Sequence, residues 1–365
     1  MQRHLFLSST VAATVIPVVA AAQAPFSGGS PNEKFNEFMA FLRSRNVKQY
    51  ATMPPGGIYE EQYVSIGGIE QWVTIHGEDR SNPALLFLHG GPGEATNPWT
   101  FIAFAPWLKH FTVVQWDQRG AGRTFEKTGP SIAPTITLDR MLQDGIELAN
   151  YLCQHLRKRQ IFIVGQSFGT ILGVMMARKQ PDLFAAYIGT GQVGDATRGY
   201  YVAYDAMIDY AQSIGDDNAI AELKSVGPPP YKSGAGYQMQ RKWSNIFENA
   251  DQYLPGTIGL TLVAPGGSIQ DEINYALASP MSADRLVPQT STLTESDLGT
   301  EFKVPVYIIQ GALDFTTPTS LAKNYFDSLR APRKAFATIP DAGHFAVFTH
   351  PRAFLAEFAN FVLSD

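Results

Sequence analysis

The feature that most constrains the fold is a regular alternation of short apolar runs with longer amphipathic stretches. Four of these runs have the length and the continuous apolar character of strands that are buried on both faces. They lie at residues 84–88, 111–116, 161–164 and 304–309, with helical patterns at residues 138–156 and 168–179. This alternation predicts an α/β fold, in which a mostly parallel central sheet carries helices on both faces.

The strand pattern fades after about residue 195 and resumes after residue 300, so we expect a helical cap inserted into one core. A hairpin opens the core, and an amphipathic helix at residues 32–45 precedes it. The predicted parts are a signal peptide at 1–24, an N-terminal extension with a helix at 25–57, the first part of the core at 58–194, the cap at 195–300 and the second part of the core at 301–365.

The first 24 residues have the features of a secretory signal peptide. Arg3 lies in a short polar start, an apolar stretch follows at residues 5–20, and small residues stand at Ala22 and Ala24. Cleavage is expected after Ala22 or after Ala24. The alternative is that the apolar stretch is retained as an N-terminal anchor, but it is shorter than the ~20 residues that a spanning helix needs. We therefore expect a periplasmic or secreted protein that has no stable membrane span once the leader is removed.

The composition narrows the class of ligand. Apolar residues make up 45% of the chain and charged residues 17%, as in globular proteins, and the formal net charge is −5. Nucleic acid is not expected as a partner, because phosphate binding needs clustered Lys and Arg. A small or neutral substrate fits the composition better.

A serine nucleophile is predicted at Ser167. It is the centre of residues 165–169 (Gly-Gln-Ser-Phe-Gly), which stand between an apolar strand and a helical pattern. In this context the serine occupies a sharp strand-to-helix turn that exposes its hydroxyl, and side chains on the flanking glycines would crowd the neighbouring elements.

A second glycine-rich loop, residues 89–93 (His-Gly-Gly-Pro-Gly), follows the apolar run at 84–88 directly. Ligands bind at this carboxyl edge of parallel sheets. The backbone N–H groups of Gly91 and Phe168 are therefore predicted to form the oxyanion hole. His89 is expected to be a structural hydrogen-bonding residue of the loop.

The base and the acid are predicted at His344 and Asp314. His344 follows the expected strand at residues 334–339, and Asp314 follows the strand at 304–309, which gives the chain order Ser, acid, His. Asp341 is the alternative acid, but it is only three residues from His344 and is expected to be engaged in its own turn. The acid holds the imidazole in the correct tautomer during attack.

Together with residues 117–124 (Asp-Gln-Arg-Gly-Ala-Gly-Arg-Thr), these motifs resemble the prolyl iminopeptidases, a family of the α/β-hydrolase superfamily. The resemblance covers roughly residues 60–190 and 300–365. It implies an α/β-hydrolase fold with an inserted cap, release of an N-terminal residue, preferably proline, from peptides, and no metal or cofactor. It also implies the triad roles given above, while Asp117 and Arg119 are expected to brace the loops.

The substrate contacts are less well defined by the sequence. An aminopeptidase has to neutralise a buried substrate ammonium, and the family uses glutamates of the cap for this purpose. Glu94, next to the oxyanion loop, and Trp99 are the predicted substrate contacts. Other acids are candidates by region only and are otherwise expected to be solvated: Asp195, Asp205, Asp209, Glu222 and Glu248.

Two other functions remain open at this point. An esterase or lactonase would use the same triad on a neutral ester, and Gln166, where family members often have glycine, is typical of more general esterases. A catalytically inactive α/β hydrolase could serve as a binding module, although such proteins lose triad residues and this chain has a candidate for each position.

Overall fold

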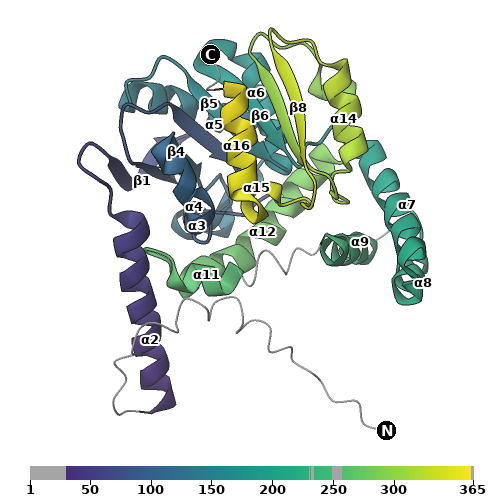
Figure 1. The fold of residues 1–365 in the computed structure, drawn as a ribbon, viewed down its shortest axis with the longest axis horizontal. Helices are drawn as coiled ribbons and strands as arrows, with labels where there is room; N and C mark the ends of the chain where they lie inside the picture. Colours follow the sequence, from purple (N-terminus) through teal and green to yellow (C-terminus); the bar gives the residue numbers. More distant parts are fainter. Residues whose placement is uncertain (1–29, 230, 232–233, 249–256, 363–365) are drawn as a thin grey trace.

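A computed structural model describes residues 30–229, 231, 234–248 and 257–362 (Figure 1). The predicted signal peptide at residues 1–24 lies outside the described residues. Within them, no helix is both long and apolar enough to cross a membrane.

The described strands form one eight-stranded sheet with the order β1-β2-β4-β3-β5-β6-β7-β8. The first two strands pair antiparallel, as does β2 with β4, and all later pairs are parallel. The strands are β1 (Ile58–Ile66), β2 (Ile69–Gly77), β3 (Ala84–Leu88), β4 (Thr112–Trp116), β5 (Ile161–Gln166), β6 (Phe184–Thr190), β7 (Val306–Gly311) and β8 (Lys334–Ile339).

The strand order reverses beside β3. The chain runs from β3 to β4 on one side and then returns to place β5 on the other side of β3. In open α/β sheets, ligands bind outside the carboxyl ends of the strands at such a switch point. The two glycine-rich loops, which follow β3 and β5, therefore meet at the position that favours a binding site.

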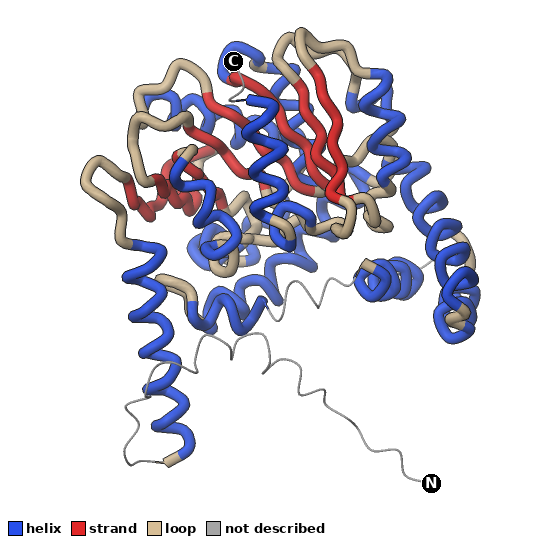
Figure 2. The backbone as a smooth tube through the Cα atoms, in the orientation of Figure 1, coloured by secondary structure: helices blue, strands red, loops and turns tan. Residues whose placement is uncertain are grey.

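Two apolar layers cover the sheet, and the residues of β3 show why. Leu86 and Leu88 belong to the cluster that includes α5 and α6, whereas Leu85 and Phe87 point to the other face and pack with α16 and η3. A strand that is buried on both faces needs apolar residues at consecutive positions, so the continuous runs in the sequence are explained. Figure 2 shows the helices on either side of the red sheet.

The helices of the core and its N-terminal extension are α2 (Pro31–Asn46), η2 (Val47–Ala51), α3 (Phe101–Phe104), η3 (Ala105–Lys109), α4 (Gly122–Thr128), η4 (Pro130–Thr135), α5 (Leu138–His155), α6 (Phe168–Lys179), η5 (Pro181–Leu183), α14 (Thr319–Ser328), α15 (Ala346–Thr349) and α16 (Pro351–Val362). Between β6 and β7 lie α7 (Ala196–Ile214), α8 (Asp217–Val226), α9 (Gly234–Phe247), α11 (Thr257–Val263), α12 (Ile269–Thr290) and α13 (Glu295–Leu298).

The helices between β6 and β7 have a small core of their own, formed by α7, α8 and α9. Met207, Leu223 and Trp243 are buried in it. The N-terminal helix α2 lies beside α11 (Figure 1), where Arg43 and Asn46 donate to the carbonyl oxygens of residues 262 and 263 at 2.6 and 2.8 Å. These donors satisfy two carbonyl groups at the end of α11, which otherwise lack a partner.

The α/β-hydrolase fold predicted from the sequence is confirmed, with most element bounds within two or three residues. The strand β6 was not predicted. Its sequence, Phe-Ala-Ala-Tyr-Ile-Gly-Thr, contains two alanines and a glycine, residues with low strand propensity, so it lacks the apolar signature of the other buried strands. Burial between β5 and β7 outweighs that weak local preference.

Candidate active site

Ser167 occupies the strained turn between β5 and α6. Its backbone has φ 54° and ψ −121°, a conformation that is unfavourable for a residue with a side chain and that clusters at functional sites. A Cβ atom on Gly165 would lie 2.6 Å from the Gly169 carbonyl oxygen, and one on Gly169 would lie 2.1 Å from the Leu88 oxygen. Both flanking positions must therefore be glycine for strand, turn and helix to pack this closely.

His344 and Asp314 form a buried pair. His344 Nδ1 lies 3.2 and 3.1 Å from the two carboxylate oxygens of Asp314. The residues come from the loops after β8 and β7 respectively, as expected from the sequence. Asp341, the alternative acid, is exposed to solvent. With Nδ1–H donating to the carboxylate, Nε2 is the nitrogen left free to act as a base.

The environment of His344 stabilises its protonated form. Burial alone would lower the pKa of the imidazole, but the negative charge of Asp314, the hydrogen bond to it and the charge of Glu248 together hold the pKa above its ordinary value. A general base that gains a proton during attack is helped by this surrounding charge.

Two residues that sequence reasoning did not identify hold Asp314 in place. Gln310 Nε2 donates to Oδ2 at 2.7 Å, and Thr317 donates to the carboxylate through its backbone N–H at 2.7 Å and its hydroxyl at 2.8 Å. Thr317 Oγ1 also lies 3.2 Å from His344 Nδ1. These donors, from the end of β7 and from the loop that follows it, fix the carboxylate orientation.

Gly191, which follows β6, lies close to both His344 and the backbone of Ser167. A Cβ atom built there would be 2.8 Å from His344 Cε1 and 3.4 Å from the Ser167 nitrogen. The imidazole and the serine backbone therefore lie against the same small residue. Because β6 was not predicted, this position had no signal in the sequence.

A cavity of about 110 Å³ opens beside Ser167, and Gly91 and Phe168, the expected oxyanion donors, line it with the serine. Most of the remaining lining is apolar and comes from α6, the segment after β6, the helices between β6 and β7, and the loop after β7: Ile171, Val193, Val287, Phe315, Pro318 and Leu321. Two charged residues line it as well, Asp195 and Arg241. Within the described residues, no group of three or more His, Cys, Asp or Glu side chains could hold a metal ion.

The two predicted substrate contacts lie elsewhere. Trp99 is buried in the core, where its ring centroid is 4.8 Å from that of Phe348 in an edge-to-face contact, and it does not line the cavity. Glu94 is half-buried and also outside the lining, and its charge acts on Tyr275, whose pKa it helps raise to about 12. Proximity in sequence to the oxyanion loop did not predict the direction of either side chain.

Glu248, one of the acids expected to be solvated, is instead buried with 4% of its surface exposed. Its carboxylate accepts hydrogen bonds from the backbone of His344 and from the loop after Asp314. The expectation of a surface acid was wrong here because it considered only the helical pattern of α9, and the partners lie 67 to 96 residues further along the chain.

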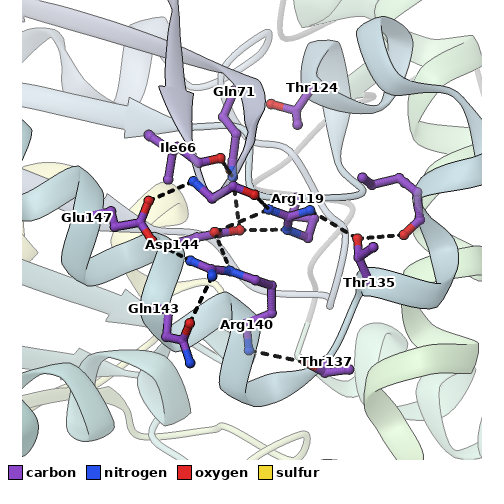
Figure 3. A network of polar contacts seen from close by, with 12 residues as sticks. Ile66, Gln71, Arg119, Thr124, Thr135, Thr137, Arg140, Gln143, Asp144 and Glu147 are labelled. Carbon is purple, nitrogen blue, oxygen red and sulfur yellow. Dashed lines mark hydrogen bonds and ion pairs between the residues drawn. The ribbon is translucent and has the colours of Figure 1, made fainter.

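The residues after β4 act as a brace and do not line the cavity, as expected. Arg119 binds both oxygens of buried Asp144, at 2.7 and 3.3 Å, and donates to the Gly67 carbonyl at 2.8 Å, as Figure 3 shows. Asp117 accepts from the Arg123 backbone and from Asn97, both at 2.9 Å. These contacts tie the β1–β2 turn, helix α5 and the loop after β4 together.

His89 is likewise structural. Gln118 donates its backbone N–H to Nε2 at 3.3 Å, so the ring proton lies on Nδ1, which donates to the Gly90 carbonyl at 2.9 Å. Burial lowers the pKa of His89 to about 4, so the ring is neutral at physiological pH. A neutral, doubly hydrogen-bonded imidazole fixes the loop that carries Gly91.

The fold and this arrangement are those of an α/β hydrolase, and residues 83–217 match the model of the α/β hydrolase fold family. A probable aminopeptidase of Bacillus subtilis, YbaC, is 26% identical over 295 residues, which cover 80% of this chain and 92% of that protein. A probable proline iminopeptidase of Streptomyces coelicolor is 30% identical over 312 residues, 80% of this chain and 91% of that protein. The crystal structure of proline iminopeptidase from Mycobacterium smegmatis has a TM-score of 0.58 at 19% identity, over 84% of this chain and 98% of that one, and shows the shared fold.

The chain belongs to the proline iminopeptidase family of α/β hydrolases, and it is an enzyme of the serine hydrolase type. The resemblance inferred from the sequence motifs is thereby confirmed. The similarity extends over nearly the whole length of the relatives, and so includes the region between β6 and β7 as well as the core.

Proposed function

We propose that this enzyme releases the N-terminal residue, preferably proline, from peptides through an acyl-enzyme on Ser167. The observation that carries the proposal is the similarity over about nine-tenths of the length of a probable aminopeptidase and a probable proline iminopeptidase. The buried His344–Asp314 pair and the cavity beside Ser167 support it.

In the proposed mechanism, His344 Nε2 removes the proton from Ser167 Oγ as the oxygen attacks the substrate carbonyl carbon. Asp314 keeps the other ring nitrogen protonated and stabilises the imidazolium. The N–H groups of Gly91 and Phe168 stabilise the oxyanion, each by about 3 kcal/mol. The imidazolium then protonates the departing amine, and a water molecule activated by His344 hydrolyses the ester and regenerates Ser167.

Substrate recognition is proposed to combine apolar contact with charge. The helices α7 to α13 act as the cap, and of the acids suggested by the sequence, Asp195 lies on the cavity wall. One of its carboxylate oxygens accepts from the Arg198 backbone at 2.8 Å, where Asp195 caps α7. Its charge is then available to a substrate ammonium in the cavity.

An esterase acting on small neutral esters is the second candidate, because most of the cavity wall is apolar. Hydrolysis of proline β-naphthylamide, N-acetylproline β-naphthylamide and p-nitrophenyl acetate separates the two. We expect proline β-naphthylamide to be cleaved. Acetylation of its amine should lower kcat/KM by at least about 100-fold, since it removes the ammonium group and leaves the carboxylate in the site without a partner. Turnover of the ester alone would contradict the aminopeptidase and leave the serine hydrolase chemistry intact.

We also propose that the enzyme is exported to the periplasm or beyond, with its leader cut after Ala22 or Ala24. Expression of the full chain followed by cell fractionation and intact mass measurement tests this. We expect the periplasmic or medium fraction to contain a protein whose mass corresponds to a chain that begins at Gln23 or Pro25. A protein that retains Met1 and stays in the cytosolic fraction would refute export.

A further inference from the structure

Glu248 links the cap to the two loops that carry the proposed acid and base. It directly follows α9, and its Oε2 accepts from the backbone N–H of His344 at 2.6 Å. Its Oε1 accepts from the backbone N–H groups of Phe315 at 2.9 Å and Thr316 at 3.1 Å. One side chain therefore binds the backbone of the base itself and of the two residues that follow Asp314.

Burying this carboxylate is costly, so its contacts have to compensate for the lost hydration. Charge-assisted bonds from backbone N–H groups are of the strong kind. The fit is also tight, because a Cβ atom on Gly343 would lie 2.6 Å from both the Cβ and the Oε2 of Glu248. The glycine before His344 leaves room for this carboxylate.

We propose that Glu248 is a positioning residue, which holds the backbone of His344 and of the loop after Asp314 at the separation that aligns the two side chains. The inference rests on the proposed triad. The three backbone contacts of Glu248, which we call the Glu248 clamp, originate in the cap. The alignment of His344 and Asp314 therefore depends on the end of α9 remaining in place. Displacement of that end would release three backbone groups from the two loops together.

Charge gives the clamp a second effect. The charged groups that act on Glu248 and His344 include Asp314 and Arg241, and the two residues also act on each other. Burial, together with the negative charge of Asp314, raises the pKa of Glu248 to about 7. The negative charge of Glu248 in turn stabilises the His344 imidazolium, so removing it should lower the pKa of His344.

Glutamine cannot replace this residue. Both carboxylate oxygens accept from N–H groups, whereas an amide offers one accepting oxygen and one donating nitrogen. In Glu248→Gln, the amide nitrogen therefore faces a backbone N–H group of one of the two loops. Two donors cannot form a hydrogen bond, so that loop has to move. Displacements of about 1 Å at a catalytic group can lower rates by about 100-fold.

The test measures kcat, KM and the pH dependence of kcat on p-nitrophenyl acetate and on proline β-naphthylamide. Ser167→Ala is assayed first, because loss of its activity is required before the result for Glu248 can be interpreted. Asp284→Asn is the matched control: it removes one carboxylate from an exposed position on cap helix α12, outside the cavity lining. Circular dichroism and thermal melting verify folding.

We expect Glu248→Gln to lower kcat about 10- to 100-fold with KM within about twofold, and to move the acidic limb of the pH profile to lower pH. Glu248→Asp keeps the charge but shortens the reach, so kcat should fall while the limb stays in place. This variant decides the matter if the glutamine variant does not fold. A folded Glu248→Gln with unchanged kcat and pH profile would overturn the proposal. So would a change confined to KM, which would make Glu248 a substrate contact.

Discussion

Replacing Ser167 with alanine is expected to lower kcat on any accepted substrate by about four to six orders of magnitude. The loss is this large because the hydroxyl forms the covalent intermediate, and residues that act as a unit lose nearly all their effect when one is removed. The residual rate would come from binding and the oxyanion donors alone. Initial rates at saturating substrate, with wild-type enzyme prepared in parallel, measure the effect.

The matched control is Ser131→Ala, which removes a hydroxyl from an exposed position on η4. Its hydroxyl donates only to the Thr128 carbonyl at 3.3 Å, so activity should remain unchanged. Activity of Ser167→Ala within about tenfold of the wild type would rule out nucleophilic catalysis by this serine.

Asp314→Asn should lower kcat by about 10⁴-fold while the protein stays folded. The carboxylate now accepts from His344 Nδ1, Gln310 and Thr317. The amide nitrogen of asparagine is itself a donor, so it could not accept hydrogen bonds from the groups that face it. The amide would also favour the wrong imidazole tautomer and provide no negative charge to stabilise the imidazolium. Initial rates and a thermal melt of the same sample separate the loss of chemistry from a loss of folding.

Asp341→Asn is the control for this variant, since it makes the same chemical change three residues from His344 at an exposed position. It should leave kcat within about twofold of the wild type, because exposed charges contribute little. A large loss for Asp341→Asn together with a small one for Asp314→Asn would reverse the assignment of the acid.

The motifs of the candidate site could be predicted because the constraints that define each of them act between residues close together in sequence. The turn around Ser167 requires glycine on both sides within five residues, and the strand before it is a continuous apolar run. Asp314 and His344 follow strands of the same parallel sheet, so topology alone brings their loops to one edge. Pattern, turn chemistry and strand order all point to the same edge, where Ser167, Asp314 and His344 follow β5, β7 and β8.

The long-range supports were not predictable. Gln310 is the fifth residue of β7 and has the pattern of an ordinary strand position, yet its amide reaches Asp314 and accepts from the Gln192 backbone at 3.0 Å. Glu248 directly follows an amphipathic helix, a position at which a charged residue is usually solvated. The contact of Gln310 with the Gln192 backbone and the contacts of Glu248 with Phe315 and His344 join residues 67 to 118 positions apart, so they cannot be read from neighbours in sequence.

Side-chain direction was the other source of error. Trp99 follows the oxyanion loop closely and was expected at the substrate, but an edge-to-face contact with Phe348 holds it in the core. Asp195 was one of five acids suggested by region, and its position on the cavity wall follows from its place as the N-cap of α7. The sequence pattern identified the loop and the region, and packing decided which side chains reach the cavity.

Covalent trapping tests the central claim, that Ser167 is the nucleophile of a serine hydrolase, most directly. Wild-type enzyme is treated with an organophosphonate that phosphonylates activated serines, and the modified peptide is located by mass spectrometry. The account predicts a single adduct on Ser167, formed in step with the loss of activity and slowed in Asp314→Asn, because that variant lacks the oriented base. An adduct on another residue, or full activity after Ser167 has been modified, would contradict it.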